Sequence, residues 1–214
     1  MIQLPFEGIS NVKLGFNFQS ILALTIAALM GTGAIAQQIY KTDQGHTEVF
    51  FKWNHAGVVD QYGEFTRANG TLTLFPDNIE ASALEAIIET SSVASGFAPM
   101  DRMLKSARLL DVEQYPQITF KSTSIEQTGD ATALITGDLT IHGVTKPTIL
   151  EATLTFRGSH PLQRYLPDIY SGEWLAFEAK GRIPNHTVFG VGSSSTIGSK
   201  WWIDIEIRTE LKRQ

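Results

Sequence analysis

A regular alternation of apolar and polar residues runs through most of the chain after residue 40. In residues 203–208, three isoleucines alternate with Asp204, Glu206 and Arg208. Successive side chains of a β-strand point to opposite faces, so this period predicts strands with one buried face and one wet face. The pattern recurs, with turn-forming residues between, in about eight segments. These segments lie near residues 49–53, 71–75, 84–89, 118–125, 131–139, 150–156, 175–180 and 203–208.

Many short antiparallel strands predict an all-β sandwich or a closed barrel. Thr128–Asp130 predicts a hairpin turn between two of these strands. One short helix is expected around Met100–Leu110, and Ser159–Ser171 and Gly190–Lys200 are expected to form long surface loops. No repeat or linker divides this part of the sequence, which favours a single domain.

The N-terminal region has the pattern of a secretory signal peptide. Ile21–Met30 is apolar apart from Thr25, and small residues ending in Ala34-Ile35-Ala36 follow it. A membrane-spanning helix needs roughly 20 apolar residues, more than this stretch provides, so cleavage rather than anchoring is expected. We therefore expect residues 1–36 to be a signal peptide and residues 37–214 to be one periplasmic or secreted domain without a transmembrane anchor.

The first residues do not fit the basic start of a signal peptide, because they include Pro5 and Glu7. A start at Val12 would place Lys13 directly beside the N-terminus, as such signals require. The hypothesis is therefore that translation begins at Val12 and that residues 1–11 are not made.

Composition excludes several classes of function. The chain has no cysteine, and its 17 basic and 22 acidic residues give a formal net charge of −5. Disulfides, thiolate nucleophiles and cysteine-type zinc sites are therefore absent, and nothing suggests nucleic-acid binding. No nucleotide-binding or hydrolase motif is present, and the five histidines lack the spacing of metal ligands. We expect no catalytic site, no metal and no cofactor.

The apolar side chains of the predicted strands share one interior. In a filled barrel they would form a core, whereas in a lipocalin-sized barrel they would line a cavity for one ligand. Periodicity alone leaves both alternatives open. The candidate lining residues are Phe51, Trp53, Phe65, Leu72, Leu74, Phe120, Phe156, Phe177 and Phe189.

Three strings carry a resemblance to a known family. They are HTEVFFKWNHAGVVDQYGEF at 46–65, LKSARLLDVEQYPQITFKST at 104–123 and GDLTIHGVTKP at 137–147. Together they resemble the YceI-like family of secreted bacterial proteins, over about residues 40–211. The resemblance implies a periplasmic, lipocalin-like antiparallel β-barrel with a polyisoprenoid or similar long-chain amphiphile in its apolar interior. It is also compatible with a homodimer.

Three polar residues are candidates for contact with a ligand head group at the mouth of such a barrel. His55 continues the inward parity of a strand at its end, and His142 and Lys146 lie in the third string. A cation beside a pocket mouth can hold a pyrophosphate or a carboxylate.

The sequence departs from the family pattern in two places. Residues 185–190 read NHTVFG where the family has Asn-Arg-Ser-Asp-Phe-Gly, and residues 100–103 read MDRM where the family has Arg-Asp-x-His. The loss of charged positions favours a less charged ligand than a prenyl pyrophosphate, such as a quinone or a fatty-acid derivative.

The function expected from the sequence is that of a non-enzymatic carrier or scavenger of a long-chain isoprenoid or lipid. One alternative is a small-molecule enzyme, or a metal or anion site, at the barrel rim that uses His55 or His142. Another is a structural or adhesive β-domain, which would have no cavity.

Overall fold

A computed structural model of the protein describes residues 37–192 and 202–214. The expected signal peptide lies outside the described residues, as does most of the predicted loop Gly190–Lys200. Within the described ranges the strands are β1 (Gln38–His55), β2 (Val59–Phe65), β3 (Ala68–Leu74), β4 (Ala83–Glu89), β5 (Val93–Ala94), β6 (Gln117–Gln127), β7 (Thr132–Ile141), β8 (Val144–Ser159), β9 (Glu173–Ile183) and β10 (Ile203–Arg213).

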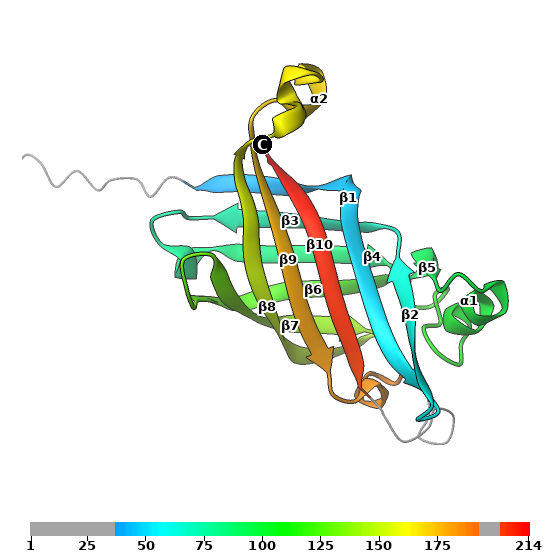
Figure 1. Cartoon of the computed structure of the whole chain (residues 1–214). Coiled ribbons are helices and arrows are strands. Elements are labelled where there is room, and N and C mark those ends of the chain that lie inside the picture. Colours follow the sequence, from blue (N-terminus) through cyan, green and yellow to red (C-terminus); the bar gives the residue numbers. More distant parts are fainter. Residues whose placement is uncertain (1–36, 193–201) are drawn as a thin grey trace, which may run out of the picture. The chain divides into compact units, whose positions relative to one another are not determined.

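Eight of these strands close into an antiparallel barrel (Figure 1). Their order is β10-β9-β8-β7-β6-β4-β3-β1, and the barrel closes because β10 also pairs with β1. That closing ladder runs from Tyr40 opposite Arg213 to Trp53 opposite Ile203. The expected lipocalin-like barrel is confirmed, and so is the hairpin between β6 and β7.

The first strand of the barrel changes partner part-way along its length. Residues 38–41 of β1 pair with β3, whereas residues 49–55 pair with β2. The ladder to β10 is irregular between Thr42 and Thr47, where this change occurs. Strand β5 pairs with β2, so the second half of β1 carries a two-stranded extension of the same sheet beside the barrel.

The helical segments lie in the connections between strands. They are α1 (Ala98–Lys105), α2 (Pro167–Tyr170) and the 3-10 turns η1 (Ile79–Ala81), η2 (Thr90–Ser92), η3 (Pro161–Arg164) and η4 (His186–Phe189). The expected helix is α1, which ends at Lys105 instead of Leu110. The predicted loop Ser159–Ser171 contains η3 and α2, each of which begins with a proline, the residue whose fixed φ suits a helix start.

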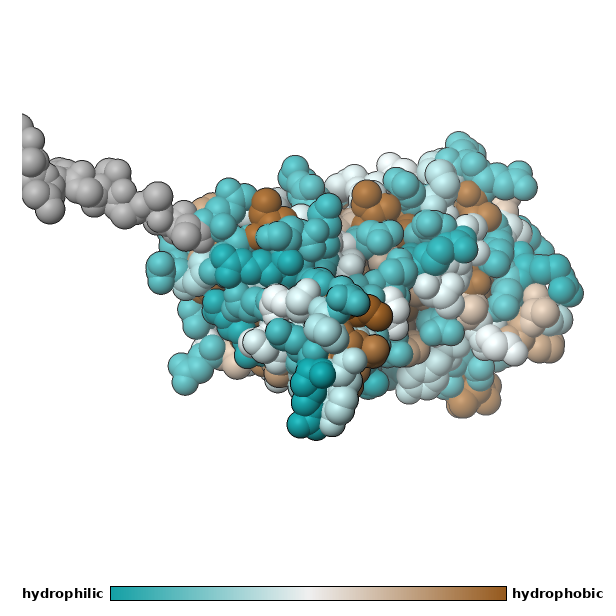
Figure 2. Space-filling view, turned by 90° about the horizontal axis from the view of Figure 1, so that it is seen from above, coloured by the Kyte–Doolittle hydropathy of each residue, from teal (hydrophilic) through white to brown (hydrophobic). Residues whose placement is uncertain are grey.

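The alternation of the sequence places the apolar side chains inside the barrel. They form two clusters, one containing Phe65, Ile118 and Phe120 and the other containing Tyr40, Leu175 and Leu211. The outer surface seen from above is mostly hydrophilic, with scattered apolar residues (Figure 2).

Glycine allows close packing at one point of the barrel wall. A Cβ built at Gly137 of β7 would lie 2.5 Å from Cζ of Phe120 and 2.6 Å from the carbonyl oxygen of Lys121. Because the second of these atoms belongs to the backbone, the neighbouring strand cannot move away easily. Gly137 thus permits both the β6–β7 ladder and the inward position of Phe120.

We expect Gly137→Ala to lower the free energy of unfolding by about 1–3 kcal/mol, because the added methyl group overpacks the wall. Urea denaturation of the purified protein measures this loss. Gly45→Ala is the matched control, since its nearest atom would lie at 3.4 Å, and it should change the free energy by less than about 1 kcal/mol. Equal stability of the two variants would contradict this account of the wall.

Candidate functional site

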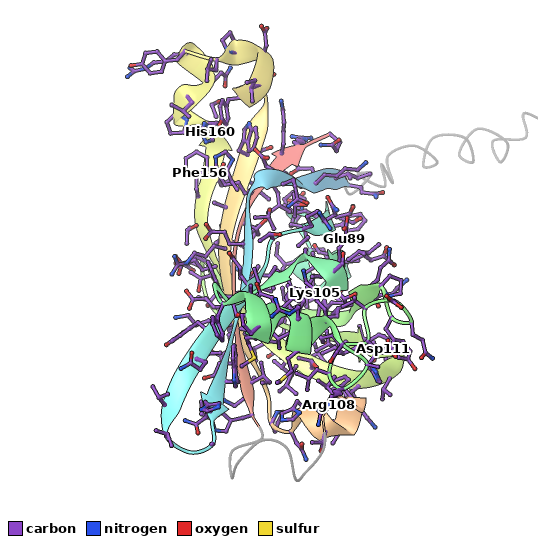
Figure 3. All side chains as sticks on the ribbon, turned by 90° about the vertical axis from the view of Figure 1, so that its right-hand side faces the viewer. Glu89, Lys105, Arg108, Asp111, Phe156 and His160 are labelled. Atoms are coloured by element: carbon purple, nitrogen blue, oxygen red, sulfur yellow. The ribbon has the colours of Figure 1, made fainter. Side chains whose placement is uncertain are left out.

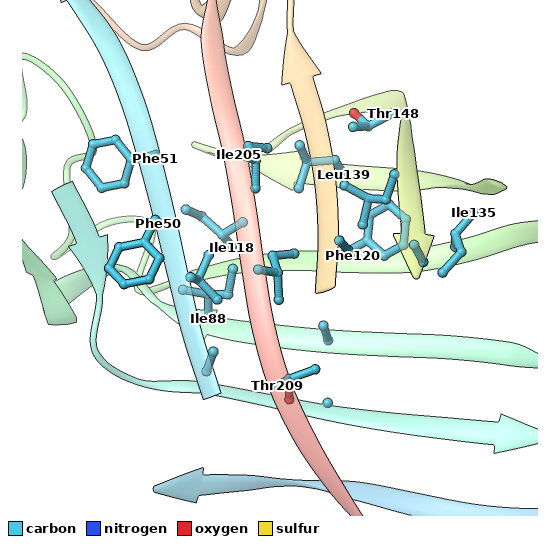
Figure 4. A pocket seen from close by; sticks show the side chains of 18 of the residues that line it. Phe50, Phe51, Ile88, Ile118, Phe120, Ile135, Leu139, Thr148, Ile205 and Thr209 are labelled. Carbon is cyan, nitrogen blue, oxygen red and sulfur yellow. The ribbon is translucent and has the colours of Figure 1, made fainter. Parts of the chain in front are cut away.

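The barrel encloses a cavity of about 660 Å³. Side chains from all eight barrel strands line it, and most of them are apolar (Figure 4). Pockets that bury small organic ligands span roughly 300–1,000 Å³. Of the two alternatives that the periodicity left open, the structure therefore shows a cavity and not a filled core.

Eight of the nine expected lining residues lie on the cavity wall: Phe51, Trp53, Phe65, Leu72, Leu74, Phe120, Phe177 and Phe189. Three of the aromatic rings form a group, with the Phe51 ring centroid 5.5 Å from that of Trp53 and 5.2 Å from that of Phe65. Their place on the wall follows from strand parity, while their contact with a ligand stays a prediction.

Phe156 is the exception and does not lie on the wall. The ladder between β8 and β9 slips, because Leu154 is opposite Phe177 whereas Phe156 is opposite Ala176. Residues directly opposite each other share a face, and one extra residue in a strand reverses the parity beyond it. Phe156 therefore faces outward with Ala176, near His160 (Figure 3), and Arg157 takes the inward position.

The three polar residues expected at the mouth do not converge. His55 is exposed at the end of β1 and reaches the cavity rim. His142 occupies the β7–β8 turn with φ of 52° and lies against Tyr115, with 4.1 Å between the ring centroids. Lys146 borders a second pocket of about 280 Å³ beside β8 and β9. His55 lines the large cavity, whereas His142 and Lys146 do not. Contact of any of the three with a ligand head group stays a prediction.

The α1 end of the cavity holds side chains that the sequence analysis did not select. Met100, Met103 and Leu104 of α1 line the cavity, and Arg108 in the following turn does too. The carboxylate of Asp101 fixes the helix by accepting hydrogen bonds from the backbone N–H and the hydroxyl of Ser95, at 2.7 and 2.6 Å. The motif string at 104–123 contains three cations, and nothing in the sequence singles out Arg108 among them as a cavity residue.

A polar cluster covers the opposite end of the barrel, next to Tyr40. Glu173 accepts hydrogen bonds from Arg157 and Arg213, both at 2.9 Å. Burial raises the pKa of Tyr40 to about 12, and the Glu173 carboxylate adds to this shift. Although burial alone would raise the pKa of Glu173, hydrogen bonds from the two arginines and Tyr40 hold it below its usual range.

A second group of titratable side chains lies on the outside of the barrel. His46 Nδ1 is 3.1 Å from Asp43 Oδ2, and Glu210 Oε2 is 3.5 Å from His160 Nε2. The His160 ring stacks on Tyr170 of α2, with 4.1 Å between centroids. These side chains brace the η3–α2 segment against the barrel. Sequence reasoning missed them because they come from three distant segments of the chain.

No group of three or more His, Asp or Glu side chains within residues 37–192 and 202–214 is placed to hold a metal ion. In the same ranges no helix is long and apolar enough to cross a membrane. Likewise, no hydrogen bond or ring contact among the described residues joins His55 to His142.

Comparison with known proteins agrees with the barrel fold. A family model described as the YceI-like domain matches residues 40–211. The chain belongs to this family. Protein YceI of Escherichia coli O157:H7 is 40% identical over an alignment of 168 residues, and the match covers 77% of this chain and 83% of that protein.

Two solved structures share the barrel of this YceI-like chain. BcnA of Burkholderia cenocepacia matches with a TM-score of 0.64 and 19% identity, covering 79% of this chain and 98% of BcnA. A polyisoprenoid binding domain from Saccharophagus degradans, implicated in plant cell wall breakdown, matches with a TM-score of 0.54 and 12% identity. It covers 82% of this chain and 98% of that domain. At these identities the likeness concerns the fold alone.

The buried tyrosine gives a pH-dependent test of this end of the barrel. Because the pKa of Tyr40 is raised on folding, its contribution to stability is fully present below the ordinary tyrosine value of about 10 and is lost as pH rises through about 12. Ultraviolet titration of the wild type and of Tyr40→Phe should differ by one ionisation with a midpoint near 12. A difference centred near the ordinary value would show that Tyr40 is accessible to water.

Proposed function

We propose that this protein is a non-enzymatic periplasmic carrier or scavenger that holds a polyisoprenoid or similar long-chain amphiphile in its barrel. The observation that carries the proposal is the apolar cavity of about 660 Å³, which is lined from all eight barrel strands. A stable core would be filled, because protein interiors pack as densely as organic crystals. A void of this size inside a closed barrel supports a binding role.

Burial of apolar surface would supply most of the affinity. Each Å² of apolar surface removed from water contributes about 25 cal/mol, before the cost of ordering the ligand is subtracted. A long, unbranched or regularly branched chain suits this site, because apolar side chains cover the wall from the aromatic group at Phe51 to Leu211. The ligand needs directional polar contacts only at its polar end.

Family membership and the ligand class of one structural neighbour support the same class of ligand. The Saccharophagus degradans domain is described as polyisoprenoid binding, and this chain shares its fold. A quinone or a fatty-acid derivative would also fit an apolar barrel with a small polar end. Delivery to the periplasm rests on the signal-like pattern of residues 1–36.

The rival proposal, an enzyme at the rim, receives no support from the positions of the two candidate histidines. His55 is exposed at the β1–β2 turn, while His142 packs against Tyr115 in the β7–β8 turn. A general base must lie within hydrogen-bond reach of the proton that it removes, and it is usually oriented by a partner. A structural or adhesive domain is disfavoured by the cavity itself.

A pair of alanines on one strand tests the proposal. Ala86 of β4 lies on the cavity wall, whereas Ala83 of the same strand is exposed. We expect Ala86→Trp to reduce the lipid that co-purifies with the protein at least about tenfold, because the indole ring occupies the cavity. Ala83→Trp should leave the lipid content unchanged.

The measurement is mass spectrometry of lipid extracted from protein purified from its native host, expressed per mole of folded protein. Ile207→Phe, a smaller change on the wall, replaces Ala86→Trp if circular dichroism shows that the latter does not fold. Equal lipid content in a folded wall variant and in Ala83→Trp would refute the cavity as the binding site.

A further inference from the structure

We propose that Arg108 holds the anionic head group of the bound amphiphile at the α1 end of the cavity. This inference rests on the proposed function and adds to it the charge, the position and the direction of the ligand. The head would lie beside Arg108, and the tail would run toward the apolar cluster of Tyr40, Leu175 and Leu211.

Charge is distributed unevenly along the cavity. Apart from histidines, the charged side chains that line the cavity in the described parts of the chain are Arg108, Asp130 and Arg157. Arg157 is paired with Glu173 at 2.9 Å, and Asp130 would repel an anion. Of the two arginines in this set, only Arg108 has no ion pair or side-chain hydrogen bond with any of the described residues. The wall therefore offers one unpaired positive charge, and it lies beside α1.

The backbone around Arg108 is fixed even though its side chain is exposed. Leu109 N–H donates to the carbonyl of Ser106 at 3.0 Å, and Asp111 N–H donates to the same carbonyl at 2.9 Å. Leu110 N–H donates to the carbonyl of Leu104, also at 3.0 Å. These hydrogen bonds hold the turn against the end of α1, so the backbone of Arg108 has a fixed position at the rim of the cavity (Figure 3).

The neighbours of Arg108 are apolar on the cavity side. Leu109 and Leu110 are both 8% exposed and both line the cavity, as do Met100 and Met103 of α1. A guanidinium at such a boundary can contact water on one side and a head group on the other, while the ligand's chain passes between leucines and methionines. An ionised partner would give a charge-assisted hydrogen bond, and a carboxylate or phosphate would match the guanidinium with two oxygens.

The acidic residues nearest in sequence do not form an ion pair with Arg108. Asp101 accepts its hydrogen bonds from Ser95, and the basic side chains that lower its pKa in addition are Lys105 and Arg102. No ion pair joins Asp111 to Arg108 in the described part of the chain. An anionic amphiphile is therefore a better match than a quinone, which was one of the ligands expected from the sequence, because a neutral quinone would gain no charge-assisted contact from Arg108.

Binding of matched charged and neutral ligands to delipidated protein tests the inference. Isothermal titration calorimetry would compare palmitic acid with methyl palmitate, and farnesyl phosphate with farnesol. We expect the wild type to bind at least one anion about tenfold more tightly than its neutral partner, a moderate ratio because Arg108 is partly in water. Arg108→Gln should lose this preference and keep its affinity for the neutral ligands. Arg102→Gln, an exposed cation on α1 that does not line the cavity, should keep the preference.

The outcomes separate this inference from the proposed function. Preference only within the palmitate pair identifies a carboxylate head group, and preference only within the farnesyl pair identifies a phosphate. Neutral ligands that bind as tightly as the anions, or an anion preference that survives in Arg108→Gln, would overturn the role of Arg108 while leaving the carrier intact. If none of the four ligands binds, both proposals fail.

Discussion

The pairing of β1 with β10 is the interaction on which the rest of the structure depends. It joins the first and the last strand of the barrel and removes the sheet edges that these strands would otherwise expose. Closure also separates an inside from an outside, so that alternation within each strand produces an apolar interior. Because this ladder spans almost the whole domain sequence, the cavity exists only once the entire chain has folded.

Most of the barrel could be predicted because period-two alternation is a local property that survives folding. Ile203, Ile205 and Ile207 all lie on the cavity wall, as their spacing requires. The expected position of Phe156 on the cavity wall was wrong because the β8–β9 register shifts between Leu154 and Phe156. The residues around Thr155 contain no pattern that predicts this shift. Alternation therefore predicts the inward-facing residues correctly up to a bulge, and beyond the bulge it assigns them to the wrong face.

The polar parts of the site were harder to predict, because their positions depend on turns and on contacts between strands that are distant in sequence. His142 and Lys146 lie in a string that carries the family resemblance, yet their side chains lie against Tyr115 and a separate pocket. Arg108 lies in another such string and reaches the cavity only through the hydrogen-bonded winding that follows α1. The tight network around Glu173 likewise joins residues from three strands, a juxtaposition that the order of the sequence does not reveal.

Helix α1 has no buried residue, although three of its side chains face the cavity. A short helix gains most of its stability from packing, and here one side of that packing is empty space. A ligand that fills the α1 end would supply the missing contacts and raise the free energy of local opening of this helix. Protection of the α1 amides from hydrogen exchange would then report whether the barrel is loaded, and a protein that receives the cargo could distinguish full from empty carriers by the rigidity of this short helix.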